Sequence, residues 1–185
     1  MKLLLPFITI LLSMPLMAQD RELLKVDRSK VVFVSDAPLE HITATNTRAH
    51  GLIDPKERTF AIQILLVEFE GFNSPLQREH FNENYLLSRK FPNAKFTGRI
   101  IEAVDLSVPG EHQVRAKGEF TLKGITKERI IPCKLVVSND GIRVSTAFDV
   151  LLEDHQIRVP RVVQQKISSV VKVDVDLLFK DQRAQ

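Results

Sequence analysis

Residues 113–122 read Gln-Val-Arg-Ala-Lys-Gly-Glu-Phe-Thr-Leu. The even positions from Val114 to Leu122 are apolar or small, and the odd positions are polar. A period of two is that of a β-strand, because successive side chains of a strand point to opposite faces of the sheet. The stretch therefore predicts a strand with one apolar face and one polar face.

The same alternation recurs along the chain. It is clear in residues 171–180, 142–148 and 96–100, and weaker in Val31–Val34, Ile42–Ala49 and Arg129–Val137, while Phe60–Val67 is apolar on both faces except at Gln63. Turn residues separate the runs, and Asn139-Asp140-Gly141 between two of them predicts a hairpin. Seven or eight short alternating strands predict an all-β fold, either an antiparallel sandwich or a barrel.

One stretch has the pattern of a helix instead. Ser74 is a good N-cap and Pro75 suits the first helical position. Apolar side chains from Leu76 to Leu87 can share one face, and the stretch ends near Phe91-Pro92. A second short helix is predicted over Leu151–Ile157. The fold is thus expected to carry one or two short helices.

The first 18 residues form a separate segment. Lys2 is followed by an almost wholly apolar run that ends at Ala18, before Gln19-Asp20-Arg21. A basic start, an apolar stretch and a small final residue are typical of a secretory signal peptide. The alternative is an uncleaved anchor, but the run is shorter than the roughly 20 residues that span a bilayer. We therefore expect cleavage after Ala18 and a periplasmic or secreted protein without a stable membrane span.

Composition limits the remaining possibilities. The 185 residues include 26 Lys+Arg, 23 Asp+Glu and 44% hydrophobic residues, which is ordinary for a globular protein. No linker or repeat divides the chain, so residues 20–180 are expected to form a single domain. Without Lys2 the formal charge is +2, from 25 basic and 23 acidic residues, which is weak evidence for an anionic partner. One Cys excludes an intrachain disulfide and a Cys-cluster zinc site.

Several segments resemble the signature of the YceI-like proteins. Phe69–Ser74 reads Phe-Glu-Gly-Phe-Asn-Ser, and after the predicted helix Ser88–Gly98 reads Ser-Arg-Lys-Phe-Pro-Asn-Ala-Lys-Phe-Thr-Gly. Gly118–Lys127 reads Gly-Glu-Phe-Thr-Leu-Lys-Gly-Ile-Thr-Lys, and a Ser-x-Val-x-Phe strand lies at Ser29–Phe33. Together with Gly51–Asp54 and the final alternating strand, the resemblance covers nearly the whole chain after the leader.

The resemblance implies an antiparallel lipocalin-like β-barrel of about eight strands with helices near one end. It also implies an exported protein that holds a long isoprenoid chain, such as a polyprenyl phosphate or a quinone tail, inside the barrel. Two segments depart from the family pattern: Glu83–Leu87 lacks the Phe-Phe stretch of many members, and Thr43–His50 lacks their glycines. These departures concern the identity of the ligand more than the fold.

Aromatic residues are the candidate ligand-binding side chains, because large apolar rings suit an isoprenoid tail. Each single Phe has core packing as its alternative role. Tyr85 could place its hydroxyl toward a ligand head group or lie at the helix surface. Basic residues near loops, such as Arg158 and Arg161, are expected to be solvated rather than bound to a head group. The candidates are Phe33, Phe72, Phe81, Tyr85, Phe91, Phe96, Phe120 and Phe148.

Catalysis finds little support in the sequence. The five His show no metal-ligand spacing, and Cys133 lies on the apolar side of its strand, where a buried hydrophobe is expected rather than a nucleophile. No basic stretch interleaved with aromatic residues suggests nucleic-acid binding. We therefore expect no catalytic residue, no metal and no cofactor.

The sequence is best interpreted as a non-enzymatic exported barrel that binds an isoprenoid or other long-chain apolar lipid. The alternative is an interaction or structural module whose barrel is filled by its own side chains. An enzyme would need titratable groups that converge in one pocket. Monomer and homodimer both stay open, because nothing in the sequence selects between them.

Overall fold

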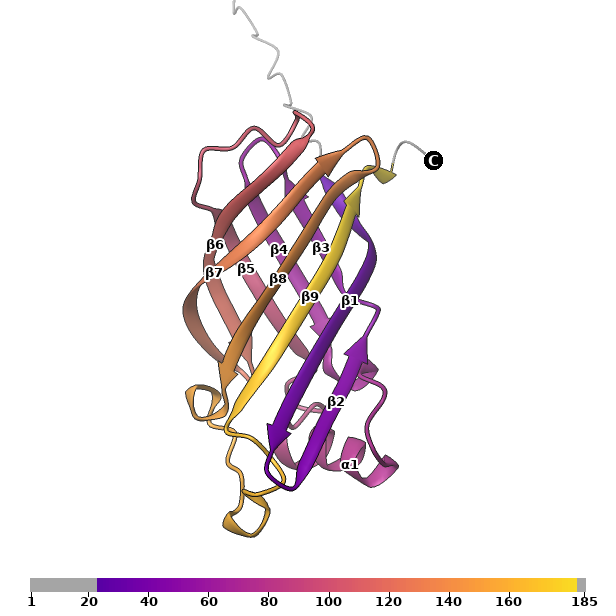
Figure 1. Ribbon diagram of the computed structural model, residues 1–185, viewed down its shortest axis with the longest axis vertical. Coiled ribbons are helices and arrows are strands. Elements are labelled where there is room, and N and C mark those ends of the chain that lie inside the picture. The colour runs from indigo at the N-terminus through magenta and orange to yellow at the C-terminus, as the bar shows by residue number, and fades with distance from the viewer. Residues whose placement is uncertain (1–22, 183–185) are drawn as a thin grey trace, which may run out of the picture.

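Eight antiparallel strands close into a barrel in the computed structural model, which describes residues 23–182 (Figure 1). The order around the barrel is β1-β3-β4-β5-β6-β7-β8-β9, and β9 pairs again with β1, while a ninth strand, β2, adds to one half of β1. The all-β antiparallel barrel predicted from the sequence is confirmed. The strands are β1 Leu24–Ala37, β2 Glu40–Asn46, β3 His50–Asp54, β4 Thr59–Leu65, β5 Asn93–Ile100, β6 Gly110–Leu122, β7 Ile125–Ser138, β8 Gly141–Leu151 and β9 Val170–Lys180.

The barrel closes where its first strand meets its last. β1 and β9 pair from Lys25 opposite Lys180 to Val34 opposite Lys172, with one irregularity between Val26 and Arg28. The other edge of β1 pairs with β3 near Leu24 and with β2 from Val31 onward. β1 therefore pairs with strands on both edges, and the pairing with β9 closes the circle of strands.

A break between β2 and β3 opens the sheet at one end. Residues 47–49 belong to neither strand, so the predicted strand Ile42–Ala49 ends earlier, at Asn46. Asn46 is fully buried; its Nδ2 donates to the Leu65 carbonyl at 3.0 Å, and its Oδ1 accepts from the Arg48 amide at 2.8 Å. These bonds satisfy the polar groups that the interrupted ladder leaves unpaired. Beyond Leu65 the chain leaves the barrel wall, pairs once with β2 where Glu70 lies opposite Thr45, and joins the wall again at β5.

The helical segments lie mainly in that excursion and at the same end of the barrel (Figure 1). Ser74 Oγ accepts from the Gln77 amide, and Pro75 is the first helical residue, as predicted. The α-helix is short and continues as one π-helical turn, and the second predicted helix is a 3₁₀ turn. The bounds are η1 Leu66–Glu68, α1 Pro75–His80, η2 Phe81–Tyr85, η3 Leu152–His155 and η4 Arg161–Val163.

A glycine pair lets two strands approach closely in the wall. Gly98 of β5 lies directly opposite Gly118 of β6. A Cβ added at Gly98 would lie 2.1 Å from the Lys117 carbonyl oxygen, and one at Gly118 would lie 2.2 Å from that of Thr97. Any side chain at either position would force the two backbones apart. Glycine inside a strand marks such a close approach.

The predicted leader, residues 1–18, lies outside the described residues, so its cleavage stays a prediction. Within residues 23–182, no helix has both the length and the apolar character needed to cross a membrane.

Candidate functional site

A cavity of about 560 Å³ occupies the barrel interior. Alternate residues of the strands line it, so the apolar faces predicted from the period of two point inward. On β9, for example, the lining residues are Val171, Val173, Val175, Leu177 and Phe179. The volume falls within the range of roughly 300–1,000 Å³ typical of small-molecule pockets.

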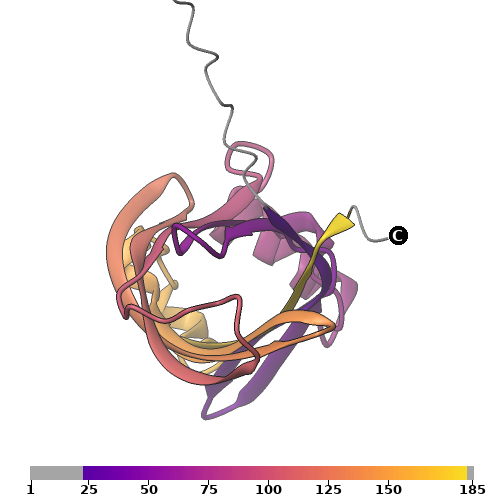
Figure 2. The ribbon, with the colours of Figure 1, turned by 90° about the horizontal axis from the view of Figure 1, so that it is seen from above.

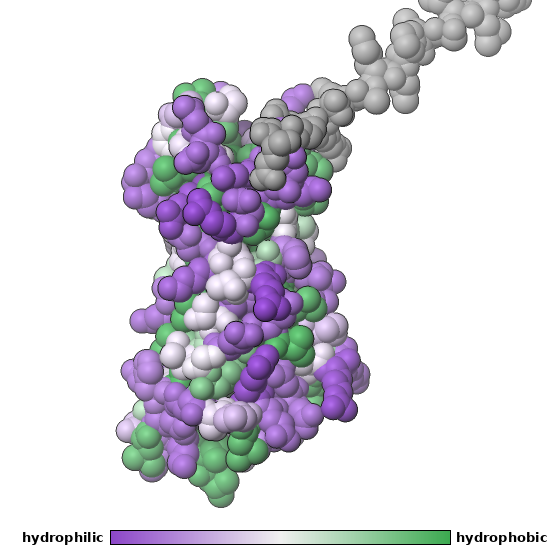
Figure 3. Space-filling view, turned by 90° about the vertical axis from the view of Figure 1, so that its right-hand side faces the viewer, coloured by the Kyte–Doolittle hydropathy of each residue, from purple (hydrophilic) through white to green (hydrophobic). Residues whose placement is uncertain are grey.

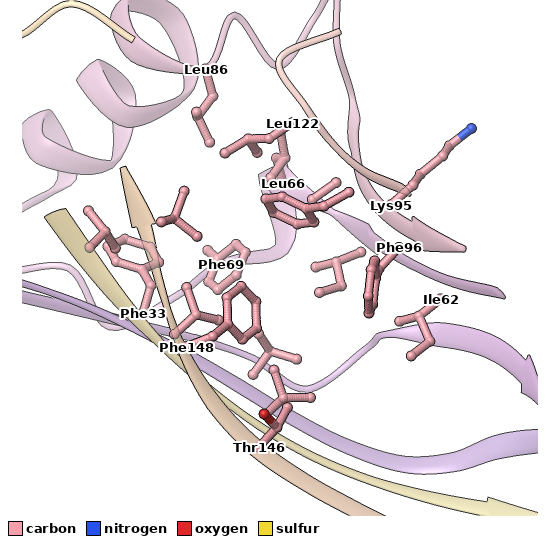
Figure 4. A pocket seen from close by; sticks show the side chains of 18 of the residues that line it. Phe33, Ile62, Leu66, Phe69, Leu86, Lys95, Phe96, Leu122, Thr146 and Phe148 are labelled. Carbon is pink, nitrogen blue, oxygen red and sulfur yellow. The ribbon is translucent and has the colours of Figure 1, made fainter. Parts of the chain in front are cut away.

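Four phenyl rings form a connected series along the cavity wall. Phe96 lies 5.0 Å from Phe60 and 6.5 Å from Phe120 between ring centroids. Phe120 in turn lies 6.0 Å from Phe148, edge to face. Figure 4 shows Phe96 and Phe148 directed into the same space as Leu66 and Phe69, whereas Lys95 points away from it. The wall thus offers flat apolar surfaces with few directional demands.

A second aromatic group, which we call the mouth cluster, consists of Phe33, Phe69, Phe72 and Phe81. Phe33 stacks on Phe81 with centroids 5.2 Å apart, and Phe69 and Phe72 lie 5.9 Å and 5.1 Å from the same ring. Phe33 belongs to β1, whereas Phe81 begins η2. The mouth cluster therefore attaches the helical segment to the barrel.

The two ends of the cavity differ in exposure. At the end away from the helices, the lining residues Ile100, Val114 and Phe179 are all buried. At the helical end, the lining includes the exposed side chains of Leu76, His80 and Lys166. The cavity therefore opens at the helical end, which we call the mouth.

The connection between β5 and β6 closes the opposite end. It crosses above the barrel in Figure 2, and its Leu106 is only 4% exposed and joins the hydrophobic core. Glu102 fixes this loop, because its Oε2 accepts from the Arg115 amide at 2.7 Å and its Oε1 from Arg115 Nε at 2.8 Å. These hydrogen bonds from Arg115 lower the pKa of the Glu102 carboxyl. We call residues 101–109 the stopper loop.

A polar network holds α1 against the β1–β2 hairpin at the mouth. Gln77 Nε2 donates to Glu40 Oε1 at 2.9 Å, and the Gln77 Oε1 accepts from the Asn73 amide at 3.0 Å. Asn73 Nδ2 donates to the His41 carbonyl at 2.9 Å. Tyr85 also lines the cavity here, and burial raises the pKa of its hydroxyl.

Among the described residues that line the deep part of the cavity, Thr146 and Cys133 carry polar side-chain groups, and both groups form hydrogen bonds. Thr146 Oγ1 donates to the Pro132 carbonyl at 2.6 Å, and Cys133 Sγ donates to the Ile131 carbonyl at 3.3 Å. Burial raises the pKa of the Cys133 thiol, which disfavours the reactive thiolate. The predicted role of Cys133 as a small buried hydrophobe agrees with this placement.

His155 lies behind the wall near the mouth. It is fully buried, its Nδ1 lies 3.2 Å from the Ile125 carbonyl, and its Nε2 has no hydrogen-bond partner among the described residues. Its ring meets Phe120 edge to face at 5.2 Å. Burial lowers the pKa of the imidazole, so the neutral form is favoured.

Seven of the eight predicted binding residues line the cavity: Phe33, Phe72, Phe81, Tyr85, Phe96, Phe120 and Phe148. Phe91 is not among the lining residues. Its ring packs against Gly124 in the β6–β7 turn, where an added Cβ would lie 2.5 Å from the ring, and Lys90 Nζ lies 5.2 Å from the ring centroid.

Three further phenylalanines of the lining were not among the candidates: Phe60, Phe69 and Phe179. The alternation of β9 already places Phe179 on the apolar face, so the sequence contained a usable signal for it. Phe60 begins a run that is apolar on both faces, and Phe69 lies outside any strand. Their direction could not be derived from periodicity.

The model of the YceI-like domain matches residues 24–179 of this chain. This range covers all the strands of the barrel except the last residue of β9. No curated protein matches the sequence significantly.

Solved structures share the fold at low sequence identity. A polyisoprenoid binding domain from Saccharophagus degradans, implicated in plant cell wall breakdown, has a TM-score of 0.72 at 16% identity and covers 85% of this chain and 98% of its own. BcnA from Burkholderia cenocepacia has a TM-score of 0.68 at 14% identity, with 80% and 94% covered. The YCEI protein of Campylobacter jejuni has a TM-score of 0.56 at 12% identity, with 73% and 80% covered.

Proposed function

Because this chain belongs to the YceI-like domain family, we propose that it is a non-enzymatic carrier that holds the tail of an isoprenoid-type lipid in its barrel. The ligand class is a long, slender apolar chain, such as the tail of a polyprenyl phosphate or a quinone. The fold shared with a polyisoprenoid binding domain supports this class.

The single observation that carries the proposal is the cavity itself. It is about 560 Å³ in volume, lined almost wholly by aliphatic and aromatic side chains, and open at the mouth. A tail that enters there meets the mouth cluster first and then the ring series Phe60, Phe96, Phe120 and Phe148. The eight rings of the mouth cluster and the ring series all line this one cavity, and six of them are binding candidates from the sequence.

Burial of the tail supplies the affinity. Each 100 Å² of apolar surface removed from water contributes roughly 2.5 kcal/mol. Association costs about 4–15 kcal/mol, so a ligand must bury several hundred Å² to bind usefully. A chain of several isoprene units meets this requirement, whereas a small polar solute does not.

The cavity also bears on the alternatives. A barrel filled by its own side chains would leave no such volume, so the cavity favours a carrier over an interaction module. An enzyme would need reactive groups that converge on the ligand. In the deep cavity, Thr146 and Cys133 instead donate to backbone carbonyls.

We further propose that the protein acts outside the cytoplasm, in a periplasm or secreted, on the basis of the predicted leader. An apolar lipid that must cross an aqueous compartment needs a protein to shield it from water. Sequestration of the tail in a closed barrel would meet this need without a chemical step.

A tryptophan reporter tests the proposal, because the natural chain has no Trp. Phe148→Trp places an indole on the cavity wall, and a polyprenyl alcohol is titrated into the purified full chain. We expect a saturable shift of Trp emission and a discrete bound mass in native mass spectrometry. The absence of both would refute the carrier proposal.

Two variants provide matched controls. Lys172→Trp places the indole on the exposed, outward side of β9, one residue before the inward Val173, and its emission should not respond. Val175→Phe, combined with Phe148→Trp, adds volume to the lining and should weaken binding. Equal responses from Phe148→Trp and Lys172→Trp would indicate nonspecific adsorption.

A further inference from the structure

Exposed apolar side chains gather at the mouth. Among the described residues, the three most exposed large hydrophobic side chains are Val162 (90%), Leu39 (65%) and Leu76 (56%). They belong to η4, the β1–β2 turn and α1, which all lie at the helical end of the barrel in Figure 1. Figure 3 shows hydrophobic residues exposed at this lower end of the molecule, among those visible elsewhere on the same face. We call these three residues the apolar rim.

Hydrogen bonds join the three segments that carry the apolar rim. The Leu39 amide donates to the Gln165 carbonyl at 2.8 Å, which ties the β1–β2 turn to the loop after η4. Gln77 Nε2 donates to Glu40 Oε1, which ties the same turn to α1. Leu76 itself lines the cavity. The three segments are therefore linked to one another beside the opening, which Leu76 itself lines.

Cations accompany the apolar rim. The loop of residues 156–169 contains Arg158, Arg161 and Lys166 and no carboxylate. Lys166 lines the mouth, and Arg161 directly precedes Val162. Two carboxylates of the neighbouring hairpin form hydrogen bonds within the protein. Glu40 Oε1 accepts from Gln77 Nε2, and Asp36 Oδ1 lies 3.1 Å from His41 Nδ1.

We propose that the apolar rim docks on an anionic lipid bilayer, with Val162, Leu39 and Leu76 in the interface and Arg161 and Lys166 against the head groups. Exposed apolar side chains flanked by cations are the chemistry that binds such a surface. The inference rests on the proposed function, because docking would place the mouth against the bilayer from which a lipid tail enters. The tail would then reach the cavity without exposure to water.

Vesicle flotation of the full chain tests the docking. One set of vesicles contains phosphatidylglycerol and phosphatidylcholine in equal parts, and the other contains phosphatidylcholine alone. The mass of the purified chain shows whether the leader is present, and any leader is common to all variants. We expect flotation with the anionic vesicles, weakened by added salt because exposed charges are screened.

Two matched aspartate substitutions locate the surface. Val162→Asp should weaken flotation by about tenfold or more, because it adds a like charge and removes apolar contact at an anionic surface. Val108→Asp changes a residue of the stopper loop that is 54% exposed, and it should leave flotation unchanged. Equal losses in the two variants, or no flotation of the parent chain, would overturn the proposal. Self-association through the rim in place of flotation would also overturn it, in favour of a protein partner.

The tail-binding assay separates this proposal from the proposed function. With Phe148→Trp as the reporter background, Val162→Asp should keep its response to a dispersed polyprenyl alcohol, because Val162 does not line the cavity. A chain that binds the alcohol but not vesicles refutes the docking alone. A chain that floats but does not bind the alcohol refutes the carrier function alone.

Discussion

The two ends of the barrel are built in opposite ways. The stopper loop buries Leu106 and receives two hydrogen bonds from Arg115 at Glu102. At the mouth, α1 has no buried residue and exposes Leu76, and η4 exposes Val162. One end excludes water from the cavity, whereas the other leaves a passage. The difference indicates that the buried contacts that close the barrel and the opening of the cavity lie at opposite ends.

Removal of the Leu106 side chain from the stopper loop should reveal the largest difference in stability between the two ends. Leu106→Ala should lower the free energy of unfolding by about 2–5 kcal/mol, because it deletes a buried side chain and leaves a cavity. Leu76→Ala at the mouth should change it by less than about 0.5 kcal/mol, as an exposed site does. Urea denaturation of both variants measures the difference. Similar losses would show that the two ends contribute equally to stability.

A substitution in the mouth cluster is a second test of the difference between the two ends, with a smaller expected effect on folding stability. Phe81→Ala removes contacts with three other rings and should cost about 1–3 kcal/mol of folding stability, since the ring is only partly buried. The same substitution removes apolar contacts that retain a bound tail at the mouth. A loss of about 1.4 kcal/mol from this retention corresponds to a factor of ten, so release of a bound polyprenyl alcohol should become about tenfold faster. Stopped-flow dilution of the Phe148→Trp reporter measures this rate.

Phe91→Ala is the control for that experiment, because its ring packs on Gly124 and does not line the cavity. Release should be unchanged in this variant. A release rate that rises equally in both variants would mean that the mouth cluster does not limit exit.

The pH dependence of folding stability is a third test of the difference between the two ends, with the smallest expected effect. Burial lowers the pKa of His155, so the unfolded chain binds a proton on this group at a higher pH than the folded chain does. Stability from the neutral imidazole is present above the ordinary pKa of about 6.5. It is lost as the pH falls below that value toward the lower pKa of the folded state, by at most about 1.4 kcal/mol per pH unit.

Thermal unfolding between pH 7 and pH 5 measures this dependence. His155→Gln should flatten it, whereas His80→Gln, at an exposed residue of α1, should not. If both variants keep the pH dependence of thermal unfolding that the parent chain has, a group other than His155 causes that dependence. Hydrogen exchange would further show whether η3, which carries His155, opens before the stopper loop does.

The period of two in the sequence predicted most of the strand residues that face the cavity. Residues of β6, β8 and β9 on the predicted apolar faces line the cavity, and the Ser74 N-cap marks the start of α1 as expected. Periodicity reports which side chains share a face, and that information is local. It is therefore available from the sequence wherever a strand has one polar face.

The two ends were harder to predict, because they depend on contacts between distant segments. Leu106 lies in an irregular loop, and nothing in its neighbours indicates that it is buried. Phe91 was predicted to bind ligand because it lies near the helix, but the turn at Gly124 receives its ring instead. The break at residues 47–49 depends on a hydrogen bond from Asn46 to Leu65, 19 residues away.

The seam between β1 and β9 has a consequence for the order of events during synthesis. It pairs residues 25–34 with residues 172–180, so nearly the whole chain must be made before the circle of strands can close. Until then both flanking strands, β1 and β8, have unpaired edges, and such edges are prone to pair with other chains. β9 also supplies five lining residues of the cavity. The cavity thus comes into existence in one late step, when the last strand is added.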